Sequence, residues 1–236
     1  MTDATSAKKP TMEQLIFELA PAEPARLSNF LSGRNAELVA LLPRFIAGDV
    51  GETGLLLWGA AGAGKTHLLL AAIESAQQQG IAARWVADPG ELASPTGGAV
   101  ALVVIDRVDT ADAAAAAAIF TLYNAQKQRG GRLIAASRTP LAALPLREDL
   151  RTRLGWGLVY EVLPLSDEDK PAAMVAFADQ RGFHLSSDVI DYLLHHGRRD
   201  LPSLLATLAA LDRASLASKR TITVPLLKSW LKRADA

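Results

Sequence analysis

The sequence predicts an α/β domain built on a five-stranded parallel sheet, followed by a small domain made only of helices. Three observations lead to this fold class. A glycine-rich turn joins a short apolar strand to a helix within residues 55–70, and a continuous aliphatic run ends in an acid at Asp106. From Ser166 onward the apolar residues repeat only with the period of a helix. The 236 residues, 50% of them hydrophobic, allow one large or two modest domains.

Composition narrows the class of protein. Lysine plus arginine number 25, as do aspartate plus glutamate, so no overall positive field indicates nucleic acid or an anionic membrane as a partner. Without cysteine the chain cannot form a disulfide, a thiolate metal site or a catalytic thiol. No stretch reaches the length of a membrane span, and Met1–Glu13 lack the apolar core of a signal peptide. We therefore expect a cytoplasmic protein.

The N-terminal arm contains one apolar segment, Gln14-Leu15-Ile16-Phe17-Glu18-Leu19. In an extended conformation Leu15, Phe17 and Leu19 share one face, and the prolines at 21 and 24 prevent continuation into a helix. Such a segment can dock in a groove on another protein or fold onto its own domain. The pattern alone favours neither.

The next elements surround a phosphate-binding P-loop. A turn-rich segment at 28–35 precedes a helix at 36–46, and a strand leads into Gly59, four further residues and Gly64-Lys65-Thr66, the G-x-x-x-x-G-K-[ST] spacing. Small residues let this loop curl so that backbone N–H groups face a phosphate, and the following helix, which runs to about Gln79 and stops at Gly80, adds its dipole. A tight connection without a ligand is the alternative. The predicted nucleotide-binding residues here are Gly59, Ala60, Ala61, Gly62, Ala63, Gly64, Lys65, Thr66 and His67.

A second strand at 81–87 and a third at 100–105 follow, and the third ends in Asp106. The third strand fits a Walker B strand, in which Asp106 holds Mg²⁺ through its water shell while the Thr66 hydroxyl binds the ion. A solvated acid at the end of a core strand is the alternative. Arg107 follows where a hydrolytic enzyme would usually carry a second acid, and Asp109 is displaced. We therefore expect weak or no ATPase activity from this chain alone.

An alanine-rich helix at 112–128 precedes a fourth strand at 132–137 and a fifth at 158–162. Ser137, at the carboxyl end of the fourth strand, is a candidate to touch the γ-phosphate or the attacking water, or it merely ends the strand. In the helical region, Ser166 resembles a capping residue for a helix to Arg181, Ser186 or Ser187 caps another to His196, and Asp200 opens a third. A short extended piece at 221–224 and a last helix from Pro225 complete the chain.

The order of these motifs resembles the AAA+ ATPases, and most of all the DnaA family of bacterial replication initiators. The matching stretches are Asn29-Phe30 with Gly33 and Asn35, Leu57-Trp58 before the P-loop, Ser137-Arg138-Thr139-Pro140, Arg153-Leu154-Gly155-Trp156-Gly157-Leu158 and Arg199-Asp200-Leu201. The resemblance implies a P-loop AAA+ domain with strand order 5-1-4-3-2 followed by an all-α lid, and ADP or ATP with Mg²⁺ as ligand. It places Asn29 and Phe30 near the adenine, Ser137 at the sensor 1 position, Arg199 at sensor 2, and Arg153 as an arginine finger for a neighbouring subunit's nucleotide.

Two features resemble the regulatory inactivators of DnaA, the Hda family. The chain ends at Ala236, just after the lid, with no room for a helix-turn-helix domain. Gln14, Leu15, Phe17 and Leu19 resemble the Q-L-x-L-x-L peptide that docks on the DNA polymerase III sliding clamp, with Glu18 where proline is frequent. The resemblance implies an arm at 1–27, an AAA+ domain at 28–164 and a lid at 165–236. It further implies a negative regulator of replication initiation that binds the clamp and promotes hydrolysis of DnaA-bound ATP.

Other functions compete with this hypothesis. A helicase loader or origin-binding adaptor ATPase would need a basic track on the lid, for which Lys228, Lys232 and Arg233 are few. A self-contained P-loop ATPase or kinase would turn over nucleotide alone. We expect no sequence-specific DNA binding and no membrane partner, and we leave homo-oligomer formation open.

Overall fold

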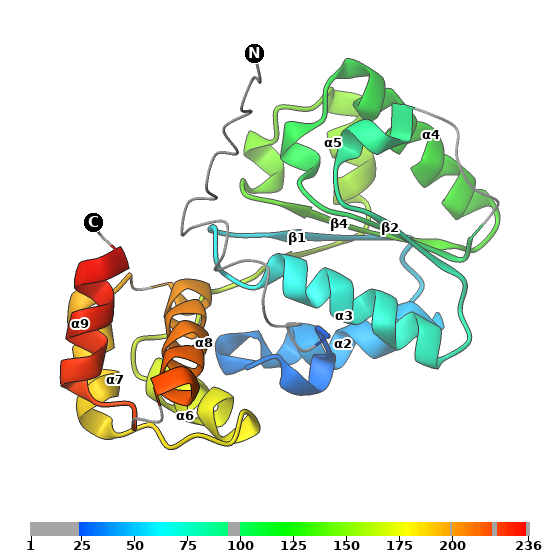
Figure 1. Cartoon of the computed structure of the whole chain (residues 1–236). Coiled ribbons are helices and arrows are strands. Elements are labelled where there is room, and N and C mark those ends of the chain that lie inside the picture. The colour runs from blue at the N-terminus through cyan, green and yellow to red at the C-terminus, as the bar shows by residue number, and fades with distance from the viewer. Residues whose placement is uncertain (1–23, 94–99, 199, 219–220, 235–236) are drawn as a thin grey trace, which may run out of the picture. The chain divides into compact units, whose positions relative to one another are not determined.

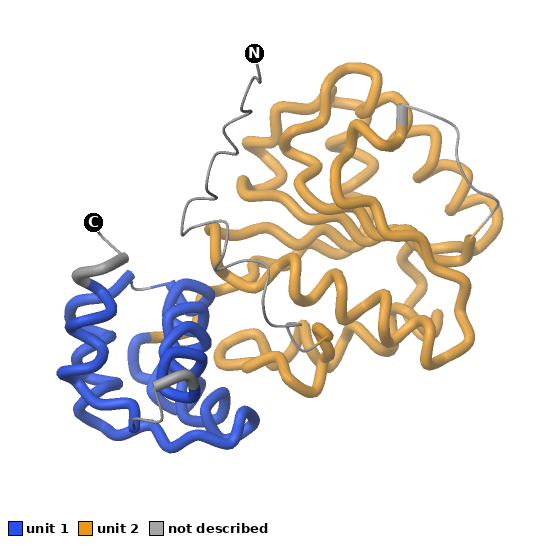
Figure 2. Tube along the Cα trace, in the orientation of Figure 1, with its two compact units in different colours: residues 1–23, 167–236 blue, residues 24–166 orange. Residues whose placement is uncertain are grey.

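The structure is a computed structural model that describes residues 24–93, 100–198, 200–218 and 221–234. Contacts within the chain divide these residues into two compact units, one from Pro24 to Ser166 and the other from Asp167 onward, coloured orange and blue in Figure 2. The predicted docking segment at 14–19 lies outside the described residues.

The first unit contains one five-stranded sheet in which every neighbouring pair is parallel. Its strands are β1 (Gly54–Trp58), β2 (Ala83–Val86), β3 (Leu102–Ile105), β4 (Arg132–Ser137) and β5 (Leu158–Glu161). The spatial order is β2-β3-β4-β1-β5, which read from the other edge is 5-1-4-3-2. The predicted fold class and sheet order are therefore confirmed.

Helices cover both faces of this sheet. The helices are α2 (Ala36–Ala47), α3 (Lys65–Gln78), α4 (Ala113–Gln128) and α5 (Glu148–Gly155), with α2 and α3 on one side and α4 and α5 on the other (Figure 1). Along β1, Leu55 and Leu57 pack toward α2 and α3, whereas Leu56 packs toward α4 and α5. Burial on both faces explains why the inner strands β1 and β3 are continuously apolar rather than alternating.

Short 3₁₀ helices connect these elements. They are η1 (Leu27–Asn29), η2 (Gly33–Asn35), η3 (Pro89–Ala93), η4 (Val108–Thr110) and η5 (Leu141–Ala143). Helix α3 ends as predicted, with Gly80 in the left-handed conformation at φ 69°. Helix α5 was not predicted, because its few apolar residues are separated by charged ones.

A buried asparagine fastens the start of α2 to the end of the sheet. The Asn35 side chain donates to the carbonyl of Leu163 and accepts from the amide of the same residue, both at 2.8 Å. The side chain of Asn35 thereby satisfies the amide and the carbonyl of Leu163, which follows the end of β5.

The second unit is a bundle of α6 (Lys170–Gln180), α7 (Ser187–His196), α8 (Leu201–Ser218) and α9 (Val224–Ala234) around an apolar core. The predicted capping by Ser166 is wrong, since α6 begins at Lys170 and Asp169 occupies the N-cap position. As predicted, α8 begins directly after Asp200, whose carboxylate accepts a hydrogen bond from the Ser203 amide at 3.0 Å. Residues 221–223 form neither a helix nor a strand, and α9 begins at Val224, one residue before the predicted start at Pro225. Within the described residues, no helix is both long and apolar enough to span a bilayer.

The close approach of β1 and β5 requires glycine at position 157. A Cβ atom at Gly157 would lie 2.1 Å from the backbone oxygen of Gly54. We expect Gly157→Ala to lower the free energy of unfolding by about 1–3 kcal/mol, because the two strands must separate. At Gly51 a Cβ would meet nothing within 4 Å, so Gly51→Ala should change stability by less than about 0.5 kcal/mol. Urea unfolding of both variants measures this, and equal stabilities would contradict the packing argument.

Candidate nucleotide-binding site

The P-loop connects β1 to α3, and its backbone conformation requires glycine. Gly62 and Gly64 have φ values of 78° and 99°, in the left-handed region that other residues disfavour. A Cβ at Gly64 would also lie 2.7 Å from the Phe30 ring. The loop therefore curls immediately before α3, whose first amides have no partners within the helix. This arrangement suits an anion.

The Lys65 ammonium group is held at the loop by backbone carbonyls. Nζ donates to the oxygens of Gly59 and Ala60, each at 2.8 Å, and the side chain is buried. Burial lowers the pKa of Lys65 below its usual value, although Asp106 and Asp109 nearby favour the charged form. An ammonium group has three N–H donors, and the two carbonyls use two of them. The third N–H of Lys65 can donate to a phosphate oxygen.

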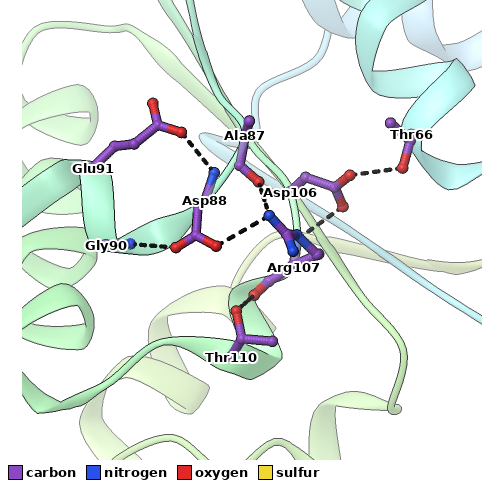
Figure 3. A network of polar contacts seen from close by, with 8 residues as sticks. All are labelled: Thr66, Ala87, Asp88, Gly90, Glu91, Asp106, Arg107 and Thr110. Atoms are coloured by element: carbon purple, nitrogen blue, oxygen red, sulfur yellow. Dashed lines mark hydrogen bonds and ion pairs between the residues drawn. The ribbon is translucent and has the colours of Figure 1, made fainter. Parts of the chain in front are cut away.

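Thr66 and Asp106 meet at the carboxyl end of the sheet. The Thr66 hydroxyl donates to one carboxylate oxygen of Asp106 at 2.7 Å, and the amide of Arg107 donates to the other at 2.8 Å (Figure 3). A hydroxyl and a carboxylate are oxygen ligands of the kind Mg²⁺ prefers beside phosphates. These two residues therefore fit the ion that the sequence predicts, which would offset phosphate charge when bound.

Ser137 lies beside β1, where it pairs in register with Trp58. The side chain is 1% exposed, and its hydroxyl donates to the carbonyl of Thr139. The donor is thus used inside the turn that follows β4, and only the acceptor capacity of the oxygen remains for a nucleotide or water.

The segment before α2 lies across the start of α3. The Phe30 ring is 5.5 Å from the His67 ring, and His67 Nε2 is 3.0 Å from the carbonyl of Arg26. The Asn29 amide instead bonds locally, to the carbonyl of Pro24 and the amide of Arg26. Phe30 and His67 therefore lie at the P-loop, whereas the polar atoms of Asn29 fix the turn.

Arg153 lies at a different place in the same unit. Its guanidinium carbon is 4.4 Å from the centroid of Trp156 and 5.3 Å from that of Phe120, within cation–π distance of both rings. A surface hollow of about 720 Å³ adjoins it, lined by Phe120, Arg147, Glu148, Asp149, Thr152, Arg153 and Trp156. None of these residues belongs to the P-loop, so this hollow is formed by residues outside that loop.

Several predicted residues cannot be placed. Arg199 and the segment 14–19 lie outside the described residues. Two features were missed by sequence reasoning, the left-handed backbone of Arg107 and the aromatic neighbours of Arg153. Arg153 and Trp156 are three residues apart, a spacing at which side chains meet along a helix. A prediction of α5 would therefore have indicated that Trp156 lies near Arg153.

Comparisons with known proteins agree with this geometry. Residues 167–231 match the family model described as Hda, lid domain. The fold is similar to domain III of the replication initiation protein DnaA of Thermotoga maritima, with a TM-score of 0.78 and 16% identity over 91% of this chain and 98% of that one. It is similar to AMPPCP-bound DnaA from Aquifex aeolicus, with a TM-score of 0.70 and 20% identity over 80% of this chain and 65% of that one.

A third similar structure is the RuvB Holliday junction branch migration motor of Thermotoga maritima, with a TM-score of 0.66 and 16% identity over 89% of this chain and 72% of that one. The chain therefore has the AAA+ fold of the DnaA domain, and residues 167–231 match the family model of the Hda lid domain.

Proposed function

We propose that this chain is a nucleotide-bound regulator of replication initiation that promotes hydrolysis of ATP bound to DnaA while it is tethered to the sliding clamp. The observation that carries the proposal is the Arg153 guanidinium, which lies over the rings of Trp156 and Phe120 beside a hollow that no P-loop residue lines. It would serve as an arginine finger for the nucleotide of the partner.

The nucleotide-binding part rests on the P-loop. Left-handed glycines, the start of α3, the Lys65 ammonium and the Thr66–Asp106 pair together offer backbone donors, positive charge and magnesium ligands. A similar DnaA structure is described as AMPPCP-bound. We infer that this chain binds ADP or ATP with Mg²⁺, and that Arg199 on the lid contacts the nucleotide as sensor 2.

The finger role rests on the surroundings of Arg153. Among the described residues, no carboxylate lies within ion-pair distance of its guanidinium group. The aromatic rings hold the cation without using its five N–H donors, so these donors can meet the charge that develops on a transferring phosphoryl group. Arginine fingers in general contribute about 10³–10⁵ in rate.

Weak hydrolysis by the chain itself is consistent with this role. Arg107 replaces the second acid after the Walker B strand, and the Ser137 hydroxyl donates within its own turn. Neither residue supplies a carboxylate to orient water at the γ-phosphate. The nucleotide of this chain would then stabilise its fold, while the chemistry takes place in DnaA.

We infer that the arm at 1–27 provides the tether. Gln14, Leu15, Phe17 and Leu19 follow the pattern of a clamp-docking peptide, and they precede the described residues. A short extended peptide can dock in a groove on another protein through side chains of one face.

Replacing Arg153 by alanine should lower the stimulated rate of ATP hydrolysis in DnaA by about 10³-fold, because an uncharged side chain cannot offset the developing charge. The measurement is phosphate release from ATP-loaded DnaA in the presence of DNA-loaded clamp. Arg151→Ala removes the same charge from the same helix and should retain stimulation. A stimulated rate unchanged by Arg153→Ala would refute the finger. No stimulation by the wild-type chain would favour the loader or adaptor function instead.

The double substitution Gln14→Ala with Leu15→Ala should abolish binding to the sliding clamp, because it removes the first two residues of the predicted docking peptide. Affinity for ADP should stay the same, since the P-loop is intact. Glu18→Ala is the control, because an extended strand directs residue 18 away from the face of Leu15 and Leu19. Surface plasmon resonance on immobilised clamp measures both, and undiminished binding by the double variant would exclude this segment as the tether.

A further inference from the structure

Arg107 has an unusual backbone conformation. It is the one non-glycine residue in the described ranges with a positive φ, at 52°. L-residues other than glycine, asparagine and aspartate seldom adopt this left-handed region, so local contacts must compensate. The residue directly follows Asp106 and begins the short helix η4.

The amide, the carbonyl and the guanidinium group of Arg107 each form hydrogen bonds at this turn. Its amide donates to Asp106 at 2.8 Å, and its carbonyl accepts from the amide and the hydroxyl of Thr110, both at 2.9 Å. Its guanidinium donates to the Ala87 carbonyl at 3.1 Å and to the Asp88 carboxylate at 3.0 Å. We call these five residues the Arg107 network (Figure 3).

The network joins the ends of two neighbouring strands. Val86, the last residue of β2, pairs with Ile105, the last residue of β3, so Ala87 and Asp88 continue beside Asp106. Asp88 is fixed in turn, because its other carboxylate oxygen accepts from the Gly90 amide and its own amide donates to Glu91, both at 2.9 Å. The guanidinium therefore contacts a well-defined turn rather than a free side chain.

This arrangement determines how the Asp106 carboxylate is presented. One oxygen accepts from the Arg107 amide and the other from the Thr66 hydroxyl. The first of these bonds comes from the peptide group that links Asp106 to Arg107, so its geometry depends on where the backbone of Arg107 is held. The carbonyl and side-chain hydrogen bonds of Arg107 hold the backbone there. Mg²⁺ demands near-ideal octahedral geometry, so the orientation of a carboxylate near it affects how well it binds.

We propose that Arg107 is a positioning residue for magnesium. Its side chain, anchored on Ala87 and Asp88, holds the turn from which the Arg107 amide binds the Asp106 carboxylate beside Thr66. The inference rests on the proposed binding of a nucleotide at the P-loop. It differs from a phosphate-binding role for Arg107, because the guanidinium is directed to the end of β2.

The test compares ADP affinity in Mg²⁺ with ADP affinity in EDTA, by calorimetry on the full chain. Arg107→Asn removes the anchor but tolerates the left-handed turn, so the enhancement of affinity by Mg²⁺ should fall about two- to fivefold, the size of an exposed ion pair. Arg107→Val should lose about tenfold, because a β-branched residue also disfavours the turn. Asp88→Asn should resemble Arg107→Asn.

Affinity in EDTA should be the same in all these variants, and Arg44→Gln, which removes the same charge from an exposed position on α2, should leave both affinities unchanged. Equal weakening with and without Mg²⁺ would overturn the inference and favour direct phosphate contact. The inference would also be overturned if Mg²⁺ did not enhance the ADP affinity of the wild type, or if every variant kept the same enhancement. A wild-type chain that binds no ADP would overturn the nucleotide site itself, and this inference with it. Thermal unfolding of each variant separates these outcomes from loss of fold, and Asp88→Asn leaves the strained residue itself untouched.

Discussion

The hydrogen bond from the Thr66 hydroxyl to the Asp106 carboxylate joins segments forty residues apart in the sequence, and the candidate site depends on it. It can form because all five strands are parallel, so that β1 and β3 end at the same edge of the sheet with β4 between them. Ligands of open α/β sheets bind at that edge for the same reason. The P-loop glycines and the turn at Arg107 adjust the backbone on either side of this bond.

The two cations of most interest are held in opposite ways. Lys65 is buried and bonded to carbonyls of its own loop, so that it stays at the place where a phosphate would bind. Arg153 is held over the rings of Trp156 and Phe120, which fix its position without using its hydrogen-bond donors. Trp156 itself is 53% exposed, as expected of a side chain that contacts a partner. The first arrangement suits a resident nucleotide and the second suits a nucleotide carried by another protein.

Much of the fold could be predicted from the sequence, because its signals are local. Aliphatic strands covered on both faces, and glycines at loop and helix ends, each depend on neighbouring residues. The order of the strands came from the resemblance to DnaA, since local patterns do not determine how parallel strands are arranged.

The features that were missed or wrong depend on contacts across the fold. Helix α5 has a weak apolar pattern and is stabilised by Leu150 and Leu154, which pack into the core under α4. Ser166 has the pattern of a cap, but α6 begins only at Lys170. The Arg107 guanidinium donates to Asp88, which follows a different strand, and the side chain of Asn35 bonds to Leu163, 128 residues away.

In the proposed function, the chain acts on a nucleotide held by its partner rather than on its own. The most direct measurement loads labelled ATP on DnaA and unlabelled ATP on this chain, then exchanges the labels, and follows phosphate release with DNA-loaded clamp present. We expect fast release only when DnaA carries the label. Fast release only when this chain carries the label would refute the proposed function.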